Sequence, residues 1–429
     1  MARKIVPIVN HGVEISGAKQ AVSRVCIVRQ DYHPGDSRIE NQAQSLIERG
    51  VSVDIICMKR AGESFTSKNN GIRIIRLPAL KRLRGTILAY LLEYVIFWVI
   101  TFFAVTILHF WRRYQLVQVC NLPDFLVFVA IFPKLTGGKV LVDFRECMPE
   151  MYAAKYRVSM ASRPIQLLSW LEQACVRFSD GAVTCTEQMR QAIIERGAPP
   201  EKIHVMMNSV DPAKFNHLLL PDPESELSDT FNIVTHGSII PRYGHETLIR
   251  AIALLRHDVP EVRLRILGRG QQQREIEALC HLLDLDDVIE VAGFVSFDVL
   301  MTHLRWAHVG AVTMVRNQET DLIHTLKMQE YMILGIPVVI SQTTAVEAYF
   351  DECCVQFFHA GDPEDLAKAL LKLRNDPIRR YQLAVNAYAR CRLYSTASQK
   401  EIFANVVQEM IGSKSRSSLR RSLRRAHER

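Results

Sequence analysis

The sequence predicts an α/β fold of two Rossmann-like domains that face each other across a cleft. Short apolar runs rich in Val and Ile alternate with helical stretches, and this alternation occurs twice along the chain. A Pro-rich, acidic stretch at Asn216–Asp229 separates the two series. The chain has 429 residues, too many for one ordinary hydrophobic core, so two or three domains are expected.

The first series predicts one parallel sheet between residues 23 and 212. Its first strand is RVCIVR, Arg24–Arg29, and an amphipathic helical stretch that Gly50 ends comes next. Five more runs follow: SVDIICM, GIRIIRL, LVQVC, KVLVDF and DGAVTC. Each run is apolar throughout, so its strand is expected to be covered by helices on both faces.

The second series predicts a similar domain over residues 231–390, after a linker at 213–230. Its apolar runs are FNIVTHG, RLRILG, VIEVAG, VGAVTMV, PVVIS and CVQFF. Residues 391–413 are a candidate for a helix that returns to the first domain. Residues 1–22 lack the apolar core of a signal peptide and are interpreted as a loosely ordered leader.

The positive charge is concentrated in the basic tail, residues 414–429. The tail holds seven Lys/Arg and one Glu, which accounts for six of the eight net positive charges of the chain. The body therefore lacks the basic surface with interleaved aromatic residues that nucleic-acid-binding proteins have. Ten scattered cysteines without a CxxC pair favour a reducing cytosol, and no metal-binding constellation stands out.

The apolar segment Thr86–Trp111 interrupts the first series. Within it, only Glu93 and His109 can ionise. The basic residues that flank the segment are Lys81, Arg82, Arg84, Arg112 and Arg113. Its uncharged core, Tyr94–Leu108, has 15 residues, whereas a helix that spans a bilayer needs about 20.

Three interpretations of this segment remain open: a transmembrane helix, a buried domain helix, and a helix or helical hairpin docked into one leaflet. We favour the third, because a span would place strands of one sheet on opposite sides of the membrane, and because basic flanks suit anionic headgroups. The expected location is the cytoplasmic face of the inner (cell) membrane, as a peripheral or monotopic protein. The basic tail is interpreted either as a second membrane-surface element or as a solvated tail.

Two turns of the second domain offer anion-binding features. HGSIIPRYGHETLIRAI places Gly237 at the end of a strand, where a ligand can approach closely, and Arg242 before a helix whose free N–H groups favour a phosphate. LRILGRG places Gly268 at the end of the next strand, where doubly wound sheets bind ligands. Ordinary strand-to-helix turns are the alternative interpretation of both.

TDLIHTLKMQEYMILGIPVV places Lys327 and Glu330 on one face of a helix that starts beyond a strand. A lysine there can neutralise a diphosphate, and a carboxylate can accept hydrogen bonds from the vicinal hydroxyls of a ribose. This pair therefore indicates a nucleotide. The alternative is a salt bridge on a solvated helix face, which the apolar surroundings make less favourable.

In the first domain, VLVDFRECMPEMYAAKY places four charged residues just beyond a strand: Asp143, Arg145, Glu146 and Glu150. Such a cluster is expected to face the cleft. Its alternative interpretation is loop surface.

From Arg24 to Arg392 the chain resembles the retaining glycosyltransferases of family 4, which have the GT-B fold. The resemblance is carried by YHPGDSRIENQAQSLIERG, VDFRECMPEMYAAKY, HGSIIPRYGHETLIRAI, LRILGRG and, most specifically, TDLIHTLKMQEYMILGIPVV. The last segment is similar to the donor-binding segment of the family, and Glu330 matches the acidic residue that relatives place on the donor ribose. The apolar segment resembles that of membrane-associated members that build bacterial surface polysaccharides.

This resemblance implies roles for particular residues. The implied catalytic residues are Arg242, Lys327, Arg145 and Glu146. Those on the donor side are Gly237, Ser238, Gly268, Asp321, Thr325, Leu326 and Glu330. Those on the acceptor side are Gly35, Asp36, Arg38 and Glu150. No cofactor or metal is expected, because a nucleoside diphosphate-sugar serves as co-substrate.

Three positions depart from the family pattern. Leu322 stands where the first acidic residue is expected, and Asp321, or else Glu319, is the candidate substitute. Ser238 and Tyr243 stand where an Arg and a Lys are usual, with Arg242 as the replacement. Arg145 stands in place of a histidine.

The expected function is therefore transfer of a sugar from a nucleoside diphosphate-sugar to a lipid-linked or polysaccharide acceptor, with retention, at an anionic membrane surface. Leu322 and Arg145 keep open a non-catalytic scaffold that binds a nucleotide-sugar. A GT-B epimerase is the third hypothesis, and it leaves the apolar segment unexplained.

Overall fold

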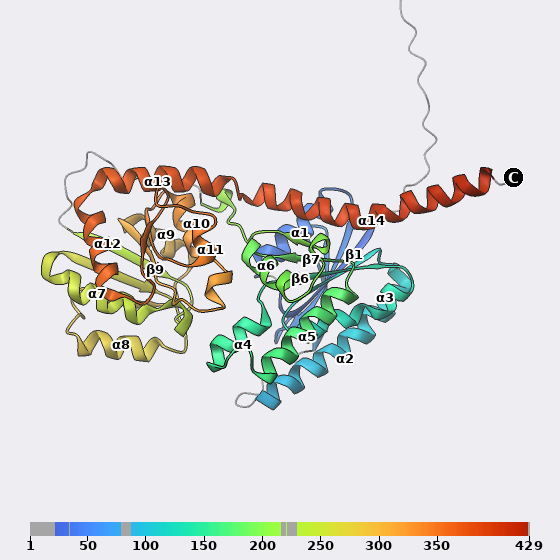
Figure 1. Cartoon of the computed structure of the whole chain (residues 1–429), viewed down its shortest axis with the longest axis horizontal. Helices are drawn as coiled ribbons and strands as arrows, with labels where there is room; N and C mark the ends of the chain where they lie inside the picture. The colour runs from blue at the N-terminus through green and yellow to red at the C-terminus, as the bar shows by residue number, and fades with distance from the viewer. Residues whose placement is uncertain (1–21, 34, 79–86, 216–219, 221–229, 428–429) are drawn as a thin grey trace, which may run out of the picture.

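The computed structural model describes residues 22–33, 35–78, 87–215, 220 and 230–427, and the side chains in it extend to Gly412. Several predicted features lie outside these residues: the leader, most of the linker, Lys81, Arg82 and Arg84, and the side chains of the basic tail. The rest forms two α/β domains that lie side by side (Figure 1). The prediction of two Rossmann-like domains is thus confirmed.

The first domain contains an eight-stranded sheet in the order β3-β4-β2-β1-β5-β6-β7-β8. Its strands are β1 (Arg24–Tyr32), β2 (Ser52–Lys59), β3 (Thr66–Asn69), β4 (Ile72–Pro78), β5 (Leu116–Cys120), β6 (Lys139–Phe144), β7 (Gly181–Thr184) and β8 (Ile203–Val205). All six predicted runs form strands, and every pair except β3–β4 is parallel. Strands β3 and β8 were not predicted, because TSKN is polar and IHV has only three residues, so neither contains a long apolar run.

The helices of the first domain cover both faces of its sheet. They are α1 (Ser37–Ile47), α2 (Ile87–Arg112), η1 (Asp124–Ala130), α3 (Ile131–Leu135), α4 (Met148–Tyr156), α5 (Arg163–Phe178), α6 (Glu187–Glu195), η2 (Pro200–Lys202) and η3 (Pro212–Lys214). The carboxylate of Asp36 caps α1 by accepting from the backbone N–H groups of Arg38 and Ile39. Both α2 and α5 pack on η1, so they lie on the same side of the domain.

The second domain contains a six-stranded parallel sheet in the order β11-β10-β9-β12-β13-β14. Its strands are β9 (Phe231–His236), β10 (Val262–Leu267), β11 (Ile289–Gly293), β12 (Val309–Val312), β13 (Val338–Ser341) and β14 (Gln356–Phe358). Its helices are η4 (Pro241–Tyr243), α7 (His245–Asp258), α8 (Gln273–Leu282), α9 (Phe297–Trp306), η5 (Thr320–Leu322), α10 (Leu326–Leu334), α11 (Thr344–Glu347), α12 (Pro363–Asn375) and α13 (Pro377–Arg392). The chain builds outward from β9 to β11 and then crosses back to β12, so the strand order reverses between β9 and β12.

The last helix, α14 (Thr396–His427), runs from the second domain back along the first (Figure 1). It packs against α1, and its fully buried Phe403 and Val407 belong to the same apolar cluster as Val25 and Ile27 of β1. Burial of these apolar side chains stabilises the contact by roughly 1.5–3 kcal/mol each. Helices α13 and α14, which a short turn separates, thus connect the two domains.

The apolar helix α2 is exposed along much of its length. By length and composition it is the one helix in the described part of the chain that could cross a membrane, and only 22% of its apolar window is buried. Its exposed large apolar side chains are Tyr90, Leu91, Leu92, Val95, Val99, Phe103, Ile107, Phe110 and Trp111. Glu93 and His109, which lie within its apolar stretch, are instead buried.

Candidate active site

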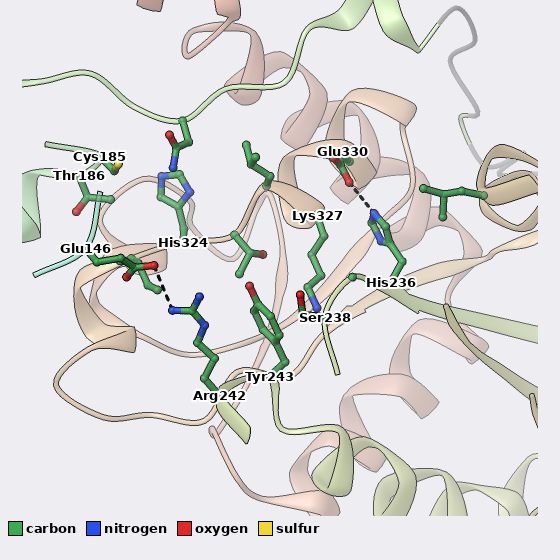
Figure 2. Close-up of a pocket in the computed structure, with 16 residues that line it drawn as sticks. Glu146, Cys185, Thr186, His236, Ser238, Arg242, Tyr243, His324, Lys327 and Glu330 are labelled. Carbon is green, nitrogen blue, oxygen red and sulfur yellow. Dashed lines mark hydrogen bonds and ion pairs between the residues drawn. The ribbon is translucent and has the colours of Figure 1, made fainter. Parts of the chain in front are cut away.

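A cavity of about 450 Å³ lies between the two domains. It opens at the carboxyl ends of β9 and β12, where the strand order of the second sheet reverses. Side chains of the first domain, including Glu146 and Thr186, close its other side (Figure 2). Open α/β sheets bind their ligands at such a reversal point.

Many of the residues singled out in the sequence line this cavity. They are Gly237, Ser238, Arg242, Thr325, Leu326, Lys327 and Glu330 from the second domain and Glu146 from the first. The structure brings these residues together although they are distant in the sequence.

Gly237, which follows β9, and Gly268, which follows β10, have different roles. Gly237 has a φ of +109° and open space where a Cβ would be, so it gives the chain its turn and leaves room for a ligand. A Cβ on Gly268 would lie 1.7 Å from the carbonyl oxygen of Gly237. Gly268 does not line the main cavity, but it lines an adjoining cavity of about 300 Å³ that shares His236, Gly237 and Ser238 with the main one. Its lack of a Cβ also lets the two turns pack together.

Three contacts hold the η4 turn against the end of β12. The backbone N–H of Val315 donates to the carbonyl of Arg242 at 3.0 Å, and the hydroxyl of Thr313 donates to the carbonyl of Tyr243 at 2.9 Å. Gly244 follows with a φ of +55°, and a Cβ there would lie 2.0 Å from the carbonyl oxygen of Thr313. These contacts fix the backbone from which the side chains of Arg242 and Tyr243 enter the cavity.

Arg242 joins carboxylates from both domains. Its Nη1 lies 2.6 Å from Oε1 of Glu319. It also lies 3.5 Å from Oε1 of Glu146 (Figure 2). Burial raises the pKa of Glu319 and of Glu146, and the charge of Arg242 offsets part of that rise. The guanidinium therefore bridges the domains, and its Nε has no hydrogen-bond partner among the described residues.

Helix α10 directs its N-terminus and two charged side chains at the cavity. Lys327 lies in its first turn, is 7% exposed, and places Nζ 4.0 Å from the ring centroid of Tyr243. Unpaired backbone N–H groups at this helix start favour an anion, as the lysine does. Thr325, just before the helix, adds a buried hydroxyl without a hydrogen-bond partner in the described part of the chain.

Burial brings the pKa values of Lys327 and Glu330 close together. It lowers the pKa of Lys327 to about 7, although the nearby carboxylate of Glu330 favours the charged lysine. It raises the pKa of Glu330 to about 7, although Lys327 opposes the rise. The Glu330 side chain still keeps 26% of its surface exposed toward the cavity mouth. An anionic ligand would draw Lys327 back to its charged form.

A tyrosine and a histidine orient Glu330. The Nε2 of His236 lies 2.6 Å from Oε2 of Glu330, and its Nδ1 lies 2.9 Å from the hydroxyl of Tyr331. Burial, and then the charge of Lys327, lower the pKa of His236 to about 3, so its imidazole is neutral. When Glu330 is ionised, its carboxylate only accepts, so Nε2–H of His236 then donates to Glu330 and Nδ1 accepts from Tyr331. This relay of hydrogen bonds, from Tyr331 through His236 to Glu330, holds one oxygen of the Glu330 carboxylate and leaves the other oxygen for a ligand.

The backbone of β12 provides the space for Tyr331. A Cβ on Gly310 would lie 2.5 Å from the ring of Tyr331. The ring is fully buried, and it lies 5.1 Å from the ring of His236, centroid to centroid. Packing thus holds the ring of Tyr331 in place. Its hydroxyl then orients the imidazole of His236, and the imidazole orients the carboxylate of Glu330.

Replacing Tyr331 by phenylalanine is expected to weaken binding of a nucleoside diphosphate about threefold to tenfold. The ring keeps its packing, but Nδ1 of His236 loses its donor, so the imidazole no longer holds one orientation toward Glu330. This corresponds to the roughly 0.5–1.5 kcal/mol of an ordinary hydrogen bond. Calorimetric titration with the nucleoside diphosphate that most stabilises the wild-type chain measures the effect.

Tyr388→Phe is the matched control, because this half-buried tyrosine lies on α13 and does not line the cavity. A Tyr331→Phe affinity equal to that of the control would show that the relay does not position Glu330.

The first acidic position of the sequence motif requires a correction. Asp321 does not reach the cavity: its carboxylate accepts from the backbone N–H and hydroxyl of Thr344 at 2.9 and 3.0 Å and pairs with Arg316. Leu322 packs on the core of the first domain, and its carbonyl accepts from the hydroxyl of Thr186. Glu319, the less favoured substitute, is the carboxylate bound to the cavity residue Arg242.

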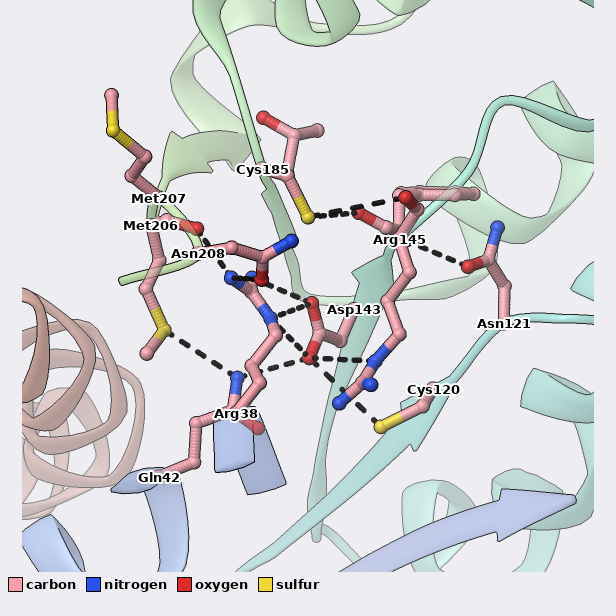
Figure 3. A network of polar contacts seen from close by, with 12 residues as sticks. Arg38, Gln42, Cys120, Asn121, Asp143, Arg145, Cys185, Met206, Met207 and Asn208 are labelled. Atoms are coloured by element: carbon pink, nitrogen blue, oxygen red, sulfur yellow. Dashed lines mark hydrogen bonds and ion pairs between the residues drawn. The ribbon is translucent and has the colours of Figure 1, made fainter. Parts of the chain in front are cut away.

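Two acceptor-side residues predicted in the first domain are structural instead. Arg38 is buried and binds the carboxylate of Asp143 with Nε and Nη2 at 2.8–3.2 Å, while its Nη1 donates to the carbonyl of Met206 (Figure 3). Glu150 is buried and pairs with Arg196, away from the cavity. The guanidinium of Arg38 is occupied by protein groups. Glu150 keeps one oxygen, Oε2, without a hydrogen-bond partner among the described residues, but it does not line the cavities at the cleft.

The remaining predicted residues of the first domain lie nearer the cleft. Asp36 caps α1 and pairs with Arg145, and both line a small cavity of about 120 Å³ next to the main one. Gly35 has a φ of +134° and faces open space beside Arg60. Arg145 lies beyond β6 with Glu146, as the sequence indicated.

Sequence reasoning missed His236, Tyr331 and the tasks of Glu319 and Tyr243. His236 directly precedes the glycine of the first turn, and this position could have indicated it. The pairing of Tyr331 with His236 depends on the register of α10 against β9, which the sequence pattern does not reveal. Among the described residues, no group of three or more His, Cys, Asp or Glu is arranged to hold a metal ion.

Two protein-family models match the chain, one on each domain. The model described as "Glycosyl transferase 4-like domain" matches residues 36–209, and that described as "Glycosyl transferases group 1" matches residues 230–376. Together they cover well over half of the chain.

Curated relatives match over shorter regions. The putative colanic acid biosynthesis glycosyltransferase WcaL of Salmonella typhimurium is 30% identical over 144 residues, which are 33% of this chain and 34% of WcaL. The amylovoran biosynthesis glycosyltransferase AmsK of Erwinia amylovora is 25% identical over 183 residues, 42% of this chain and 44% of AmsK. The matches thus span a third to under a half of these relatives.

Solved structures share the two-domain fold. Sucrose-phosphate synthase from Thermosynechococcus elongatus superposes with a TM-score of 0.69 at 17% identity, covering 91% of this chain and 100% of that one. HepE of Anabaena in complex with UDP superposes with a TM-score of 0.66 at 13% identity, covering 90% and 100%. At such identities the likeness establishes the GT-B fold alone.

Proposed function

Because the chain belongs to the glycosyltransferases of family 4, which have the GT-B fold, we propose that it moves a sugar from a nucleoside diphosphate-sugar to a lipid-linked or polysaccharide acceptor. The names of WcaL and AmsK, which refer to colanic acid and amylovoran biosynthesis, support a role in making a cell-surface polysaccharide. The titles of the HepE structures, with UDP and with UDP-glucose, support the donor class.

One observation carries the proposal: Lys327 and Glu330 enter the same cavity from one face of α10, whose N-terminus also opens there. In our proposal the helix start and Lys327 bind the diphosphate, and the free oxygen of Glu330 accepts from the ribose hydroxyls. Gly237 leaves room for the phosphates. A cation for phosphate and an oriented carboxylate for ribose are what a nucleoside diphosphate requires.

The proposed reaction proceeds with retention and without a metal ion. The acceptor hydroxyl oxygen attacks the anomeric carbon on the face that the diphosphate leaves. The bond between that carbon and the phosphate oxygen breaks, and the departing oxygen takes the hydroxyl proton. Negative charge grows on the diphosphate, so Lys327 and Arg242 stabilise the transition state more than the bound donor.

We also propose that α2 docks the protein on the cytoplasmic face of the cell membrane, as a peripheral or monotopic element. Its outward face carries exposed Phe103, Ile107, Phe110 and Trp111, which an aqueous surface would not favour. One flanking residue is excluded from headgroup binding, because the guanidinium of Arg112 pairs with Asp54 at 3.1 Å.

Other basic residues lie near the opposite end of α2, where the helix begins. Lys155, Arg157 and Arg163 are exposed around the connection between α4 and α5. The ammonium of Lys155 lies 5.9 Å from the ring centroid of Tyr90 at the start of α2. This places positive charge beside the apolar helix, as anionic headgroups favour.

The function is tested by incubating the chain with candidate nucleotide-sugars and a bacterial membrane extract. We expect release of a nucleoside diphosphate that depends on the extract, with the sugar recovered in the lipid or polysaccharide fraction. Nucleotide-sugar binding by calorimetry without turnover on a broad acceptor panel would favour the second candidate, a binding scaffold. The departures at Leu322 and Arg145 motivate that candidate. Conversion of a free nucleotide-sugar without any acceptor would indicate an epimerase.

Membrane docking is expected to weaken at least tenfold in the double variant Phe103→Glu, Ile107→Glu. Both side chains are 57% exposed on one face of α2, so their replacement leaves the packed face intact. Each lost apolar side chain removes roughly 1.5–3 kcal/mol of burial in the bilayer. Flotation with vesicles containing anionic phospholipid measures the partition.

Leu282→Glu is the control, since this residue is 80% exposed on α8 of the second domain. Equal flotation of the double variant and the control would contradict docking through α2.

A further inference from the structure

A second cavity, of about 350 Å³, lies within the first domain. It opens at the carboxyl ends of β1 and β5, and the first turns of α2 form one of its walls through Tyr90, Glu93 and Tyr94. In this sheet the chain builds outward from β1 to β4 and then crosses to β5, so β1 and β5 mark its own reversal point. Each sheet thus has a cavity where ligands of doubly wound folds bind.

The two cavities meet at one residue. Glu146 lines both, and in the donor cavity its carboxylate lies 3.5 Å from Nη1 of Arg242. Arg145, its neighbour in the chain, lines only the second cavity and the small one beside it. A ligand in the second cavity would therefore reach the edge of the donor cavity at Glu146.

The polar lining suits a ligand that carries several hydroxyl groups. Gln30, Glu93 and Glu146 each have a buried side-chain oxygen without a hydrogen-bond partner among the described residues, and Arg145 has such a nitrogen, Nη2. Buried polar atoms normally find partners. Sugar hydroxyls can donate to the oxygens and accept from the guanidinium, and the ring of Tyr90 offers an apolar face to a pyranose.

Helix α2 connects this cavity to the proposed bilayer surface. Leu91 and Leu92 are 48% and 49% exposed on its outer side, whereas Glu93 is 8% exposed and lines the cavity. Tyr90 lines the cavity and is also 45% exposed, so it stands at the mouth. The first two turns of α2 therefore face both the proposed membrane surface and the polar second cavity.

We infer that this cavity binds the sugar head of an amphiphilic acceptor whose apolar part stays in the membrane beside α2. The inference rests on the proposed function and deepens it: the membrane helix is itself a wall of the acceptor site, and Glu93 is a residue that determines acceptor specificity. The acceptor hydroxyl points toward Glu146, where the donor cavity begins.

The test blocks the cavity mouth with a thiol-directed label. Cys353 is the one exposed cysteine of the chain, so a Cys353→Ser background is used. Tyr90→Cys in this background is labelled with a bulky maleimide, and Leu282→Cys, an exposed site on the second domain, is labelled as the matched control. Transfer to a bacterial membrane extract, thermal stabilisation by UDP and vesicle flotation are measured before and after labelling.

We expect labelling of Tyr90→Cys to lower transfer at least tenfold, with the UDP-induced shift in melting temperature and the flotation retained, and labelling of the control to leave transfer within twofold. Glu93→Gln, which keeps size and removes charge, is expected to raise the acceptor KM at least fivefold while the donor KM stays within twofold. Unchanged transfer after labelling overturns the inference. So does loss of the UDP shift or of flotation along with transfer, because the label then acts elsewhere. If the unlabelled chain transfers no sugar, the proposed function itself fails, and the inference falls with it.

Discussion

Replacement of Lys327 by glutamine is expected to lower kcat for sugar transfer by about two to three orders of magnitude. The ammonium lies in the cavity at the N-terminus of α10, with its Nζ over the ring of Tyr243. Glutamine fits the same space and keeps a donor, but it carries no charge to offset the charge that grows on the departing diphosphate. The loss should therefore appear more strongly in kcat than in the donor KM.

The same lysine should make diphosphate binding depend on pH. Because burial lowers the pKa of Lys327 to about 7, the empty site holds a neutral lysine above pH 7 and must take up a proton when the diphosphate binds. Affinity should then fall by about tenfold per pH unit above 7, since one proton is linked to binding. Below pH 7 the lysine is already charged, and this dependence disappears.

Calorimetry between pH 6 and 9 checks the linkage in the wild-type chain and in two variants. Lys327→Gln should bind the diphosphate weakly, and its affinity should not change with pH above 7. In Glu330→Gln the affinity for the diphosphate should still fall with pH above 7. This result would show that the pH dependence comes from Lys327 and not from the carboxylate of Glu330, which titrates in the same range. Lys368→Gln, an exposed lysine on α12, is the control and should match wild type in both rate and slope. A kcat of Lys327→Gln within fivefold of that control would refute the role of the lysine.

The fold could be predicted almost completely because its signal is local and repeated. Strands buried on both faces of a parallel sheet need continuous apolar runs, and all twelve predicted runs form strands. Strands β3 and β8 were not predicted, because both are edge strands. An edge strand is paired on one side only, so it has less need of an apolar run. Which strand each of them pairs with is determined by the sheet that the other strands form, and not by the residues of β3 or β8.

The candidate site could be predicted only in part, for a physical reason. Positions such as Lys327 and Gly237 follow from where a strand ends and a helix begins, and the sequence reveals such junctions. The partner of a charge depends on tertiary geometry: Asp321 and Glu319 are two residues apart, yet one pairs with Arg316 and the other with Arg242. Arg38 and Glu150 were likewise assigned to a ligand because their buried partners are distant in the sequence.

Loss of the Arg38 partner is expected to produce the largest change in stability, because Asp143→Asn leaves a guanidinium buried without a counter-charge. Asp143 is fully buried, and it accepts from Arg38 through both oxygens and from Gln42 at 2.9 Å (Figure 3). Removing one partner of such a buried pair costs about 3–5 kcal/mol. The double variant Arg38→Met, Asp143→Leu should recover a large part of that loss, because it removes both charges.

Urea unfolding followed by tryptophan fluorescence measures this in a Trp306→Phe background, in which all three remaining tryptophans belong to the first domain. Glu48→Gln is the control, since this exposed carboxylate pairs with Lys400 at the surface and should change stability by less than about 1 kcal/mol. Burial alone would raise the pKa of Asp143, but Arg38 and Arg145 together lower it below its ordinary value. Its contribution is therefore complete above the pKa of an unfolded aspartate and is lost as the pH falls through the lowered value, so wild type and Asp143→Asn should converge in acid. A constant difference down to the most acidic pH would show that the ionised carboxylate does not stabilise the domain.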